Sequence, residues 1–432
     1  MSATGTPRVA FTTLGCKVNY AEMADLAGVL AADGCEIVGD SDSADVRVLN
    51  SCAVTLQADA TTRQRLQRLR RQDPDCHLIL TGCSVDANPQ RYLASDSRGE
   101  RVAIPGVDAV FSNVEKPAIA THIRGLLGDR RGTVDLPAAT RSRAFLKVQD
   151  GCDHRCTYCV VWRARGPSVS LPLDEILEKA QRAVDRGQQE IVLTGVDLGS
   201  YGRERGSSLA VLVRELLVSI GGNARIRLSS INANDITADL AALNAEARLC
   251  AHWHIPLQSG SDRILKGMHR GYRRRQYLRA VAALRDADPH TEITSDVMVG
   301  FPGETEADHE DTLSLVREVG FLHTHTFRWS PRPGTPATSL NERVADAIAH
   351  RRSREVRIAT GHTGRAARER ALKRRHHDVV WCRVDGEVAE GLTDTWHTVL
   401  AAAGPETRTG RLQRVEVTGI EGERLRARLS SP

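Results

Sequence analysis

The chain has 432 residues, of which 41% are hydrophobic and 26% charged, a composition typical of a folded protein of two to three domains and not of a disordered chain. Lys and Arg exceed Asp and Glu by 59 to 54, a mild basic excess that is compatible with a polyanionic partner but does not establish one. The sequence has no signal-peptide pattern and no apolar run long enough for a membrane span, so we expect a cytoplasmic protein whose ten cysteines bind metal or stay reduced.

The first segment repeats one pattern three times. Strand-like runs at residues 9–14, 46–49 and 78–80 are each followed by a cysteine, namely Cys16, Cys52 and Cys83. Helices are expected from about Ala21 to Gly34 and over residues 56–71. Because the carboxyl ends of strands in an open parallel sheet share one edge, we expect these three cysteines to converge on a metal site. Three buried thiols without metal are the alternative.

A linker is expected over about residues 128–142, where Gly132, Pro137 and several charges occur. Beyond it, Cys152, Cys156 and Cys159 follow the spacing C-x3-C-x2-C with no fourth cysteine nearby. A structural zinc site needs four protein ligands, whereas a 4Fe-4S cluster can accept three thiolates and leave one iron open. The spacing therefore predicts a catalytic cluster, with a redox or zinc loop as the alternative.

Strand and helix patterns alternate through the middle of the chain, with strands expected at residues 144–148, 190–195, 226–230, 253–257 and 294–300 and a helix at 173–186. Such alternation predicts a parallel sheet with outer helices, whose strand ends carry the site. His254, in one of these strands, is as consistent with a core histidine as with a functional one. A long Ala/Arg-rich helix is expected to run to about Arg375, and short β-like runs at 379–381, 398–400 and 415–420 predict a small all-β module after it.

Basic residues gather in three places that could contact a polyanion, although solvated helix faces are the more common explanation. The clusters are Arg63, Arg65, Arg68, Arg70 and Arg71; Arg270, Arg273, Arg274 and Arg275; and Arg365, Arg368, Arg370, Lys373, Arg374 and Arg375.

The three cysteines at 152–159, with Tyr158 just before the last, resemble the motif of the radical S-adenosylmethionine superfamily, in which the methionine moiety chelates the open iron. The motifs at 15–19, 50–55 and 82–83 look like the N-terminal domain of the methylthiotransferases. In that family the cysteines that match Cys16, Cys52 and Cys83 hold an auxiliary 4Fe-4S cluster. The resemblance implies an α/β chain with three domains: an N-terminal domain at residues 7–127, a partial (β/α)6 barrel at 138–370 and a TRAM-like RNA-binding domain at 373–432.

The motifs at 13–19, 147–152 and 193–199 look most like the branch that inserts a methylthio group at carbon 2 of N6-threonylcarbamoyladenosine, beside the anticodon of tRNA. Sister branches act on N6-isopentenyladenosine in tRNA and on an aspartate of a small-subunit ribosomal protein; a non-catalytic iron-sulfur RNA-binding protein is a third possibility. An aromatic C–H bond offers no polar route, so the resemblance implies a 5′-deoxyadenosyl radical made from S-adenosylmethionine.

The resemblance also implies cofactors, partners and contact residues. The cofactors would be two 4Fe-4S clusters and S-adenosylmethionine, and the partners the tRNA anticodon loop, a sulfur donor and an electron donor such as flavodoxin or ferredoxin. Candidate contacts to S-adenosylmethionine are Tyr158, Thr194, Gly195, Gln258 and Asp296. Three departures from the family pattern stand out: Asn232-Ala233 replaces Glu-Pro, Val161-Trp162 replaces Val-Pro, and residues 168–170 lack an expected arginine.

Overall fold

The first part of the chain folds into a parallel five-stranded sheet of order β2-β1-β3-β4-β7. The computed structural model describes residues 5–53, 56–95, 101–128 and 142–430, so nearly all of the expected linker lies outside the described residues. The three predicted strands are present, and two short strands extend the sheet at its edges. The strands are β1 (Arg8–Thr13), β2 (Glu36–Val38), β3 (Val46–Ser51), β4 (His77–Gly82) and β7 (Ala109–Phe111).

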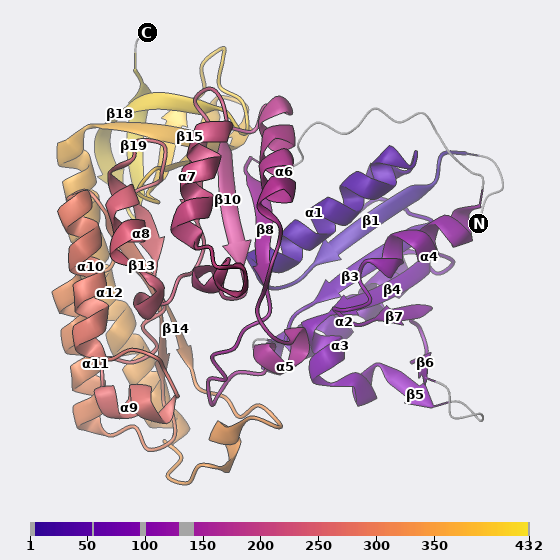
Figure 1. Ribbon diagram of the computed structural model, residues 1–432, viewed down its shortest axis with the longest axis horizontal. Helices are drawn as coiled ribbons and strands as arrows, with labels where there is room; N and C mark the ends of the chain where they lie inside the picture. Colours follow the sequence, from indigo (N-terminus) through magenta and orange to yellow (C-terminus); the bar gives the residue numbers. More distant parts are fainter. Residues whose placement is uncertain (1–4, 54–55, 96–100, 129–141, 431–432) are drawn as a thin grey trace.

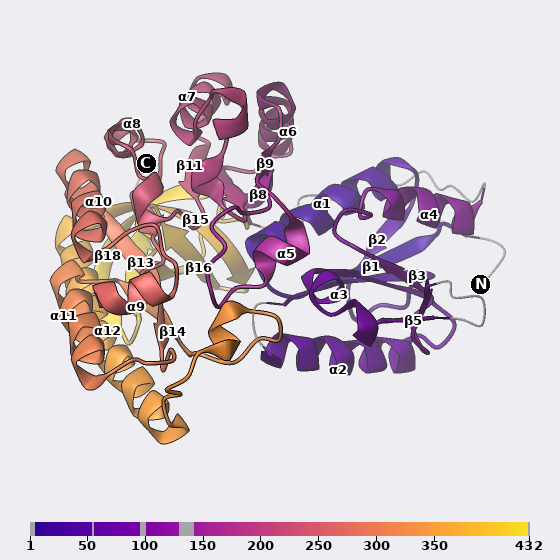
Figure 2. The ribbon, with the colours of Figure 1, turned by 60° about the horizontal axis from the view of Figure 1, so that its bottom comes forward.

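Helices cover both faces of this sheet because its strands are apolar on both sides (Figure 2). On one face, α1 (Lys17–Ala32) and α4 (Ala118–Leu127) pack on Val48 and Ile79, and on the other α2 (Leu56–Gln72) packs on Leu49 and Leu78. Helix α1 begins a turn earlier than expected, directly after Cys16, whose backbone is extended. The remaining elements are α3 (Cys83–Ala87), a 3-10 turn (Pro89–Arg91) and the hairpin β5 (Leu93–Ser95) and β6 (Arg101–Ala103).

The central part of the chain forms six parallel strands in the order in which they occur in the sequence. One sheet holds β8 (Ala144–Asp150), β10 (Glu190–Gly195) and β11 (Arg225–Leu228), and a second holds β12 (His252–His254), β13 (Glu292–Val299) and β14 (His323–Arg328). Parallel bridges from Ile226 to Leu249 and from Ser230 to His254 join the two. The predicted partial (β/α)6 barrel is therefore confirmed, and α1 packs against β8 on its open side (Figure 1).

The outer layer of this barrel is helical and the apolar core lies between the strands and these helices. The helices are α6 (Leu173–Asp185), α7 (Leu209–Ser219), α8 (Ala238–Ala242), α9 (Asp262–Gly267), α10 (Arg274–Ala287), α11 (Glu306–Val319) and α12 (Asp346–Arg374). The short strand β9 (Val169–Ser170) pairs antiparallel with the end of β8. The loops also contain α5 (Val161–Arg165) and 3-10 turns at Leu198–Ser200, Arg203–Arg205, Ala233–Asp235, Leu243–Ala245 and Pro336–Ser339. No helix in the described ranges is both long and apolar enough to cross a bilayer.

The C-terminal residues form a closed five-stranded barrel of order β15-β16-β17-β19-β18, which confirms the predicted all-β module. Its strands are β15 (His376–Asp385), β16 (Val388–Thr393), β17 (Thr398–Ala402), β18 (Leu412–Glu421) and β19 (Arg424–Leu429). Arg225 and Arg227 tie it to the central barrel, because their guanidinium groups donate hydrogen bonds to the carbonyls of Asp378, Leu392, Thr393 and Asp394.

Candidate cluster and cofactor site

The three cysteines of the C-x3-C-x2-C motif lie in the loop after β8 and line one cavity. The cavity wall also includes Val196 and Asp197 after β10, Asn232 after β11 and Gln258 after β12. These positions follow the carboxyl ends of parallel strands, where sites in barrels of this type form. The cysteine spacing alone does not predict that these loops lie beside the cysteines. The strand order of the barrel brings them to the same cavity.

A glycine shapes the start of the cysteine loop. Gly151, which precedes Cys152, has φ +72°, and an added Cβ would lie 1.8 Å from the carbonyl oxygen of Pro167. A side chain is excluded both by the left-handed backbone and by this contact. The close approach lets Cys152 donate its backbone N–H to the carbonyl of Gly166 at 3.1 Å, which fixes where the first thiol stands.

Hydrogen-bond donors point at two of these sulfurs. Arg270 Nη1 lies 3.3 Å from Cys156 Sγ, and the backbone N–H of Val161 lies 3.3 Å from Cys159 Sγ. Burial raises the pKa of Cys152 to about 12 and that of Cys159 to about 11. Since metal ligands are thiolates, a bound iron has to displace these protons, and donors such as Arg270 then stabilise the charge on sulfur.

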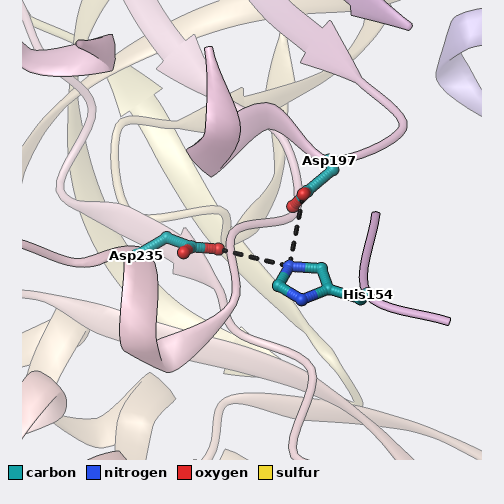
Figure 3. Close-up of side chains that lie close together, drawn as sticks. All are labelled: His154, Asp197 and Asp235. Carbon is teal, nitrogen blue, oxygen red and sulfur yellow. Dashed lines mark ion pairs between the residues drawn. The ribbon is translucent and has the colours of Figure 1, made fainter. Parts of the chain in front are cut away.

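A charged group within and beside the cysteine loop consists of His154, Asp197 and Asp235 (Figure 3). His154 Nε2 lies 3.2 Å from Asp197 Oδ2 and 3.8 Å from Asp235 Oδ2. Hydrogen bonds to these two carboxylates raise the pKa of His154 to about 10, so the ring is an imidazolium at neutral pH. These ion pairs hold the loop between Cys152 and Cys156 against the segments that follow β10 and β11.

The five predicted contacts to S-adenosylmethionine separate into two groups. Tyr158 and Gln258 line the cavity, and Gln258 Oε1 is buried with no hydrogen-bond partner in the described part of the chain. Such an orphaned acceptor fits a polar cofactor. Thr194 and Gly195 lie behind the cavity, where Gly195 packs on Gln149, and Asp296 pairs with His254 at 3.3 Å on the inner face of the barrel.

Cys16, Cys52 and Cys83 stand together at the carboxyl edge of the N-terminal sheet. A Cβ on Gly15 would lie 2.7 Å from Cys52 Sγ, which requires glycine beside this sulfur, and Cys16 and Cys83 are close enough to interact electrostatically. Cys16 is exposed, whereas Cys52 and Cys83 are buried. The three cysteines therefore lie near one another at this edge of the sheet.

An ion-pair network joins the two cysteine groups. Arg165, in α5 of the barrel, donates from Nε to Cys83 Sγ at 3.1 Å and from Nη1 to Glu22 at 2.8 Å and Asp150 at 2.9 Å. Burial alone would raise the pKa of Glu22, but Arg165, Lys116 and Lys147 hold it well below its usual range. Ala53 and Val160 add an apolar contact beside it.

The sequence reasoning missed Arg165, Glu22 and the role of Arg270. Arg270 was grouped with basic residues that could contact a polyanion, yet its side chain turns inward to Cys156 and to Asn232 Oδ1. Asn232, where the family pattern has glutamate, also donates to Asp197 Oδ1 at 3.2 Å. Cys35, Cys76, Cys250 and Cys382 lie outside both groups.

Comparisons with known proteins agree with this architecture. Residues 146–316 match the Radical SAM superfamily, and residues 8–102 match Uncharacterized protein family UPF0004. The solved structure of a radical S-adenosylmethionine methyltransferase, TsrM from Kitasatospora setae, superposes with a TM-score of 0.55 at 15% identity, covering 77% of each chain. At that identity the match supports the fold alone.

Curated relatives are similar over most of the chain. The threonylcarbamoyladenosine tRNA methylthiotransferase MtaB of Thermotoga maritima is 40% identical, covering 78% of each chain, and that of Chlamydia pneumoniae is 35% identical, covering 95% of this chain and 96% of the relative. A tRNA-2-methylthio-N(6)-dimethylallyladenosine synthase of Paracoccus denitrificans is 36% identical, covering 94% and 93%. The chain therefore belongs to the radical S-adenosylmethionine methylthiotransferase family, whose members are enzymes that use S-adenosylmethionine and 4Fe-4S clusters.

Proposed function

We propose that this enzyme inserts a methylthio group at carbon 2 of N6-threonylcarbamoyladenosine, next to the anticodon of tRNA. The observation that carries the proposal is the presence of two cysteine triads on facing edges of two domains, bridged by Arg165. The relatives named for threonylcarbamoyladenosine, which reach 40% identity, support the choice of base. An unpaired base of an anticodon loop can be splayed into a pocket between the domains.

In this proposal Cys152, Cys156 and Cys159 hold one 4Fe-4S cluster, and Cys16, Cys52 and Cys83 hold a second. Tyr158 and Gln258 contact S-adenosylmethionine, because both line the cavity of the first triad. We assign an indirect role to Thr194, Gly195 and Asp296, which shape the strands beside this cavity. Bound in this way, the clusters and S-adenosylmethionine supply the radical chemistry and the sulfur that an unreactive aromatic carbon requires.

The protein's own groups position these cofactors. The imidazolium of His154, fixed between Asp197 and Asp235, holds the first cysteine loop against the ends of β10 and β11. Arg270 holds Asn232 and Cys156 from the other side, and the apolar cluster around Tyr158, with Met268, Met298 and Phe301, excludes water from one wall. Exclusion of water protects reactive species from side reactions.

We also propose the domain limits 7–127, 138–370 and 373–432, with the C-terminal barrel acting as a TRAM-like RNA-binding domain. The enzyme would work in the cytoplasm, where it would draw electrons from a donor such as flavodoxin or ferredoxin and sulfur from a separate donor. The closed C-terminal barrel and its exposed Arg414 and Arg424 support contact with phosphates.

Nucleoside analysis of tRNA tests the proposal directly. Bulk tRNA from cells with and without the gene is digested and examined by mass spectrometry; we expect 2-methylthio-N6-threonylcarbamoyladenosine to disappear on deletion and to return with the wild-type gene. Unchanged levels of this nucleoside in the deletion strain would refute the choice of substrate.

Cysteine variants test the two-cluster arrangement in purified anaerobic protein. Wild-type protein should hold about eight iron atoms per chain and each single-triad variant about four. Cys156→Ala should abolish both cleavage of S-adenosylmethionine and modification, whereas Cys52→Ala should keep some cleavage and lose sulfur insertion. Full methylthio transfer by Cys52→Ala would leave the second triad without a role. Cys382→Ala, on the C-terminal barrel, is the matched control.

A second candidate substrate is N6-dimethylallyladenosine in tRNA. It is supported by the relative of Paracoccus denitrificans, which is 36% identical and covers 94% of this chain. The same nucleoside analysis separates the two, because the methylthio products differ in mass. Loss of the dimethylallyl product alone would select this alternative.

A further inference from the structure

The inner face of the central barrel is polar, and it is exposed at the β14 edge. Side chains at alternate positions of β12, β13 and β14 point inward: His254 Nε2 lies 3.3 Å from Asp296 Oδ2, and the rings of His254 and His325 are 5.9 Å apart. His323 packs on His325, with ring centroids 4.8 Å apart, and both of these residues are exposed. We call this surface, with Trp396 and Lys17 described next, the inner basin.

A tryptophan from the C-terminal barrel forms the floor of the inner basin. The Trp396 ring stacks on His252, with centroids 4.8 Å apart and planes at 11°. Its backbone has φ +73°, an unfavourable conformation for a side chain of this size, so the surrounding structure holds the ring in place. The cationic groups of Arg227, Arg143 and Lys17 lie 5.0, 5.2 and 5.5 Å from its centroid.

Lys17 brings a positive charge into the inner basin from the N-terminal domain. It is the first residue of α1 and directly follows Cys16. Within the described ranges, no carboxylate lies within ion-pair distance of its ammonium group, which lies over the Trp396 ring; Asp296 and Glu190 act on it from a longer distance. A half-buried ammonium group without an anion is an unusual arrangement that a bound anion would stabilise.

The carboxylates nearest to Lys17 are already engaged. The carboxylate of Glu190 forms ion pairs with three guanidinium groups, those of Arg225 at 2.6 Å, Arg227 at 2.8 Å and Arg143 at 3.5 Å. Asp296 is paired with His254. Cations therefore outnumber anions around the inner basin, and the electrostatic balance favours an incoming carboxylate over an apolar group.

The inner basin adjoins the cavity of the first cysteine triad. The backbone N–H of Gln258, which lines that cavity, donates to the carbonyl of Asp296 at 2.8 Å, and the bridge between Gln258 and Val297 is parallel. On its other side the inner basin reaches Cys16 through Lys17. A base that reacts between the two triads therefore has this surface available for a substituent.

We propose that the inner basin is the specificity subsite for the N6 substituent of the target adenine, and that Lys17 binds the carboxylate of its threonylcarbamoyl group. The inference rests on the proposed function and identifies the residue that recognises the N6 substituent of the substrate. A threonylcarbamoyl group carries a carboxylate, amides and a hydroxyl, which match the ammonium group and imidazoles of the inner basin. A dimethylallyl group has none of these, and it would desolvate Lys17 without replacing the lost hydration.

Binding of synthetic anticodon hairpins tests the subsite. Iron-loaded wild-type protein is titrated anaerobically with hairpins whose target base carries threonylcarbamoyl, its methyl ester or dimethylallyl, and Kd is measured by fluorescence anisotropy. We expect the ester, which lacks the charge, to bind about tenfold more weakly than the acid. Equal affinity of acid and ester in the wild-type protein would overturn the proposal without any variant.

Variants assign the effect to Lys17. Lys17→Gln should bind the acid about tenfold more weakly and leave the ester unchanged, whereas Lys17→Arg should keep the preference for the acid. Lys266 is an exposed lysine on α9, and Lys266→Gln is the control. Any change in Kd that this variant causes should be the same for the acid and the ester. Equal weakening of acid and ester by Lys17→Gln, at unchanged iron content, would contradict the role of Lys17.

Turnover distinguishes this result from a failure of the proposed function. If the wild-type enzyme modifies only the dimethylallyl hairpin, the proposed function and the subsite both fall. If it modifies the threonylcarbamoyl hairpin but binds acid and ester equally, the proposed function stands and the subsite assignment alone is wrong.

Discussion

Arg165 of the central barrel donates a hydrogen bond from Nε to Cys83 Sγ of the N-terminal sheet, over 3.1 Å. The same guanidinium group binds Glu22 and Asn19 of that sheet's first helix and Asp150 next to the other cysteine loop. One side chain therefore sets the position of the two cysteine triads relative to each other. Its burial makes the network costly to break, because the remaining charges stay away from water.

Replacement of Arg165 tests this network. Arg165→Met removes the cation and leaves Glu22 with Lys116 and Lys147 alone, so we expect a loss of about 3 kcal/mol in the free energy of unfolding. The second cluster should also be lost more readily, because Cys83 loses its donor. Thermal unfolding and iron content of anaerobically purified protein measure the two effects.

Arg163, in the same short helix, provides the matched control. Its side chain is exposed and donates to the carbonyl of Gly334, so Arg163→Met should change stability by less than about 0.5 kcal/mol. Equal unfolding midpoints for the two variants would show that the buried network contributes nothing.

Arg270 should set the reduction potential of the first cluster. It places a positive charge and an N–H donor 3.3 Å from Cys156 Sγ, and both stabilise the added electron of the reduced cluster. Arg270→Met should therefore shift the potential to more negative values in an electron paramagnetic resonance titration. Arg275→Met removes an exposed charge from the same segment and should leave it unchanged; a shift of equal size in both variants would point to net charge instead of the hydrogen bond.

Gly151 should tolerate no side chain. Gly151→Ala places a methyl group 1.8 Å from the carbonyl of Pro167 at φ +72°, so we expect at least about 2 kcal/mol of destabilisation and poor iron incorporation at the first triad. Gly166→Ala measures the cost of the left-handed backbone alone, because Gly166 has φ +74° but open space around it. If the two variants lost the same stability, the contact with Pro167 would carry no weight.

Local patterns in the sequence predict the elements and the cysteine groups well, for a physical reason. Strands such as β4 and β10 contain apolar runs, Leu78–Leu80 and Ile191–Leu193, and end at a glycine, and parallel strands bring their ends to one edge. Cys16, Cys52 and Cys83 could therefore be assigned to one site from their positions alone. The alternation of strands and helices likewise predicts the open barrel.

Partner choice over long distances could not be predicted in this way. Arg165 and Glu22 are 143 residues apart, and nothing in the local sequence of either indicates the pair. Arg270 resembled its neighbours Arg273 to Arg275, because charge clusters do not show which side chain turns inward. The start of α1 at Lys17 depends on the extended backbone of Cys16, a tertiary feature, and the contact between Lys17 and Trp396 depends on how three domains meet.

His397 should make the stability of the C-terminal barrel depend on pH. The residue is buried, and Nε2 has no hydrogen-bond partner in the described part of the chain. Burial, with a smaller contribution from the nearby His377 and against the opposing effect of Asp394, lowers the pKa of His397 to about 3. The folded protein therefore keeps this ring neutral at pH 5.5, while the unfolded chain protonates it near pH 6.5.

The sign follows from proton binding. Between these two pKa values the unfolded chain binds more protons than the folded one, so the contribution of His397 to stability is complete above pH 6.5 and is lost as the pH falls. From pH 7.5 to pH 5.5 the loss is about 1.4 kcal/mol. In His397→Gln this part of the decline should vanish, so that unfolding midpoints of variant and wild type converge or cross at pH 5.5. His290→Gln, at an exposed histidine, should keep the wild-type pH dependence; parallel curves for wild type and His397→Gln would show that the ring is already protonated in the folded barrel.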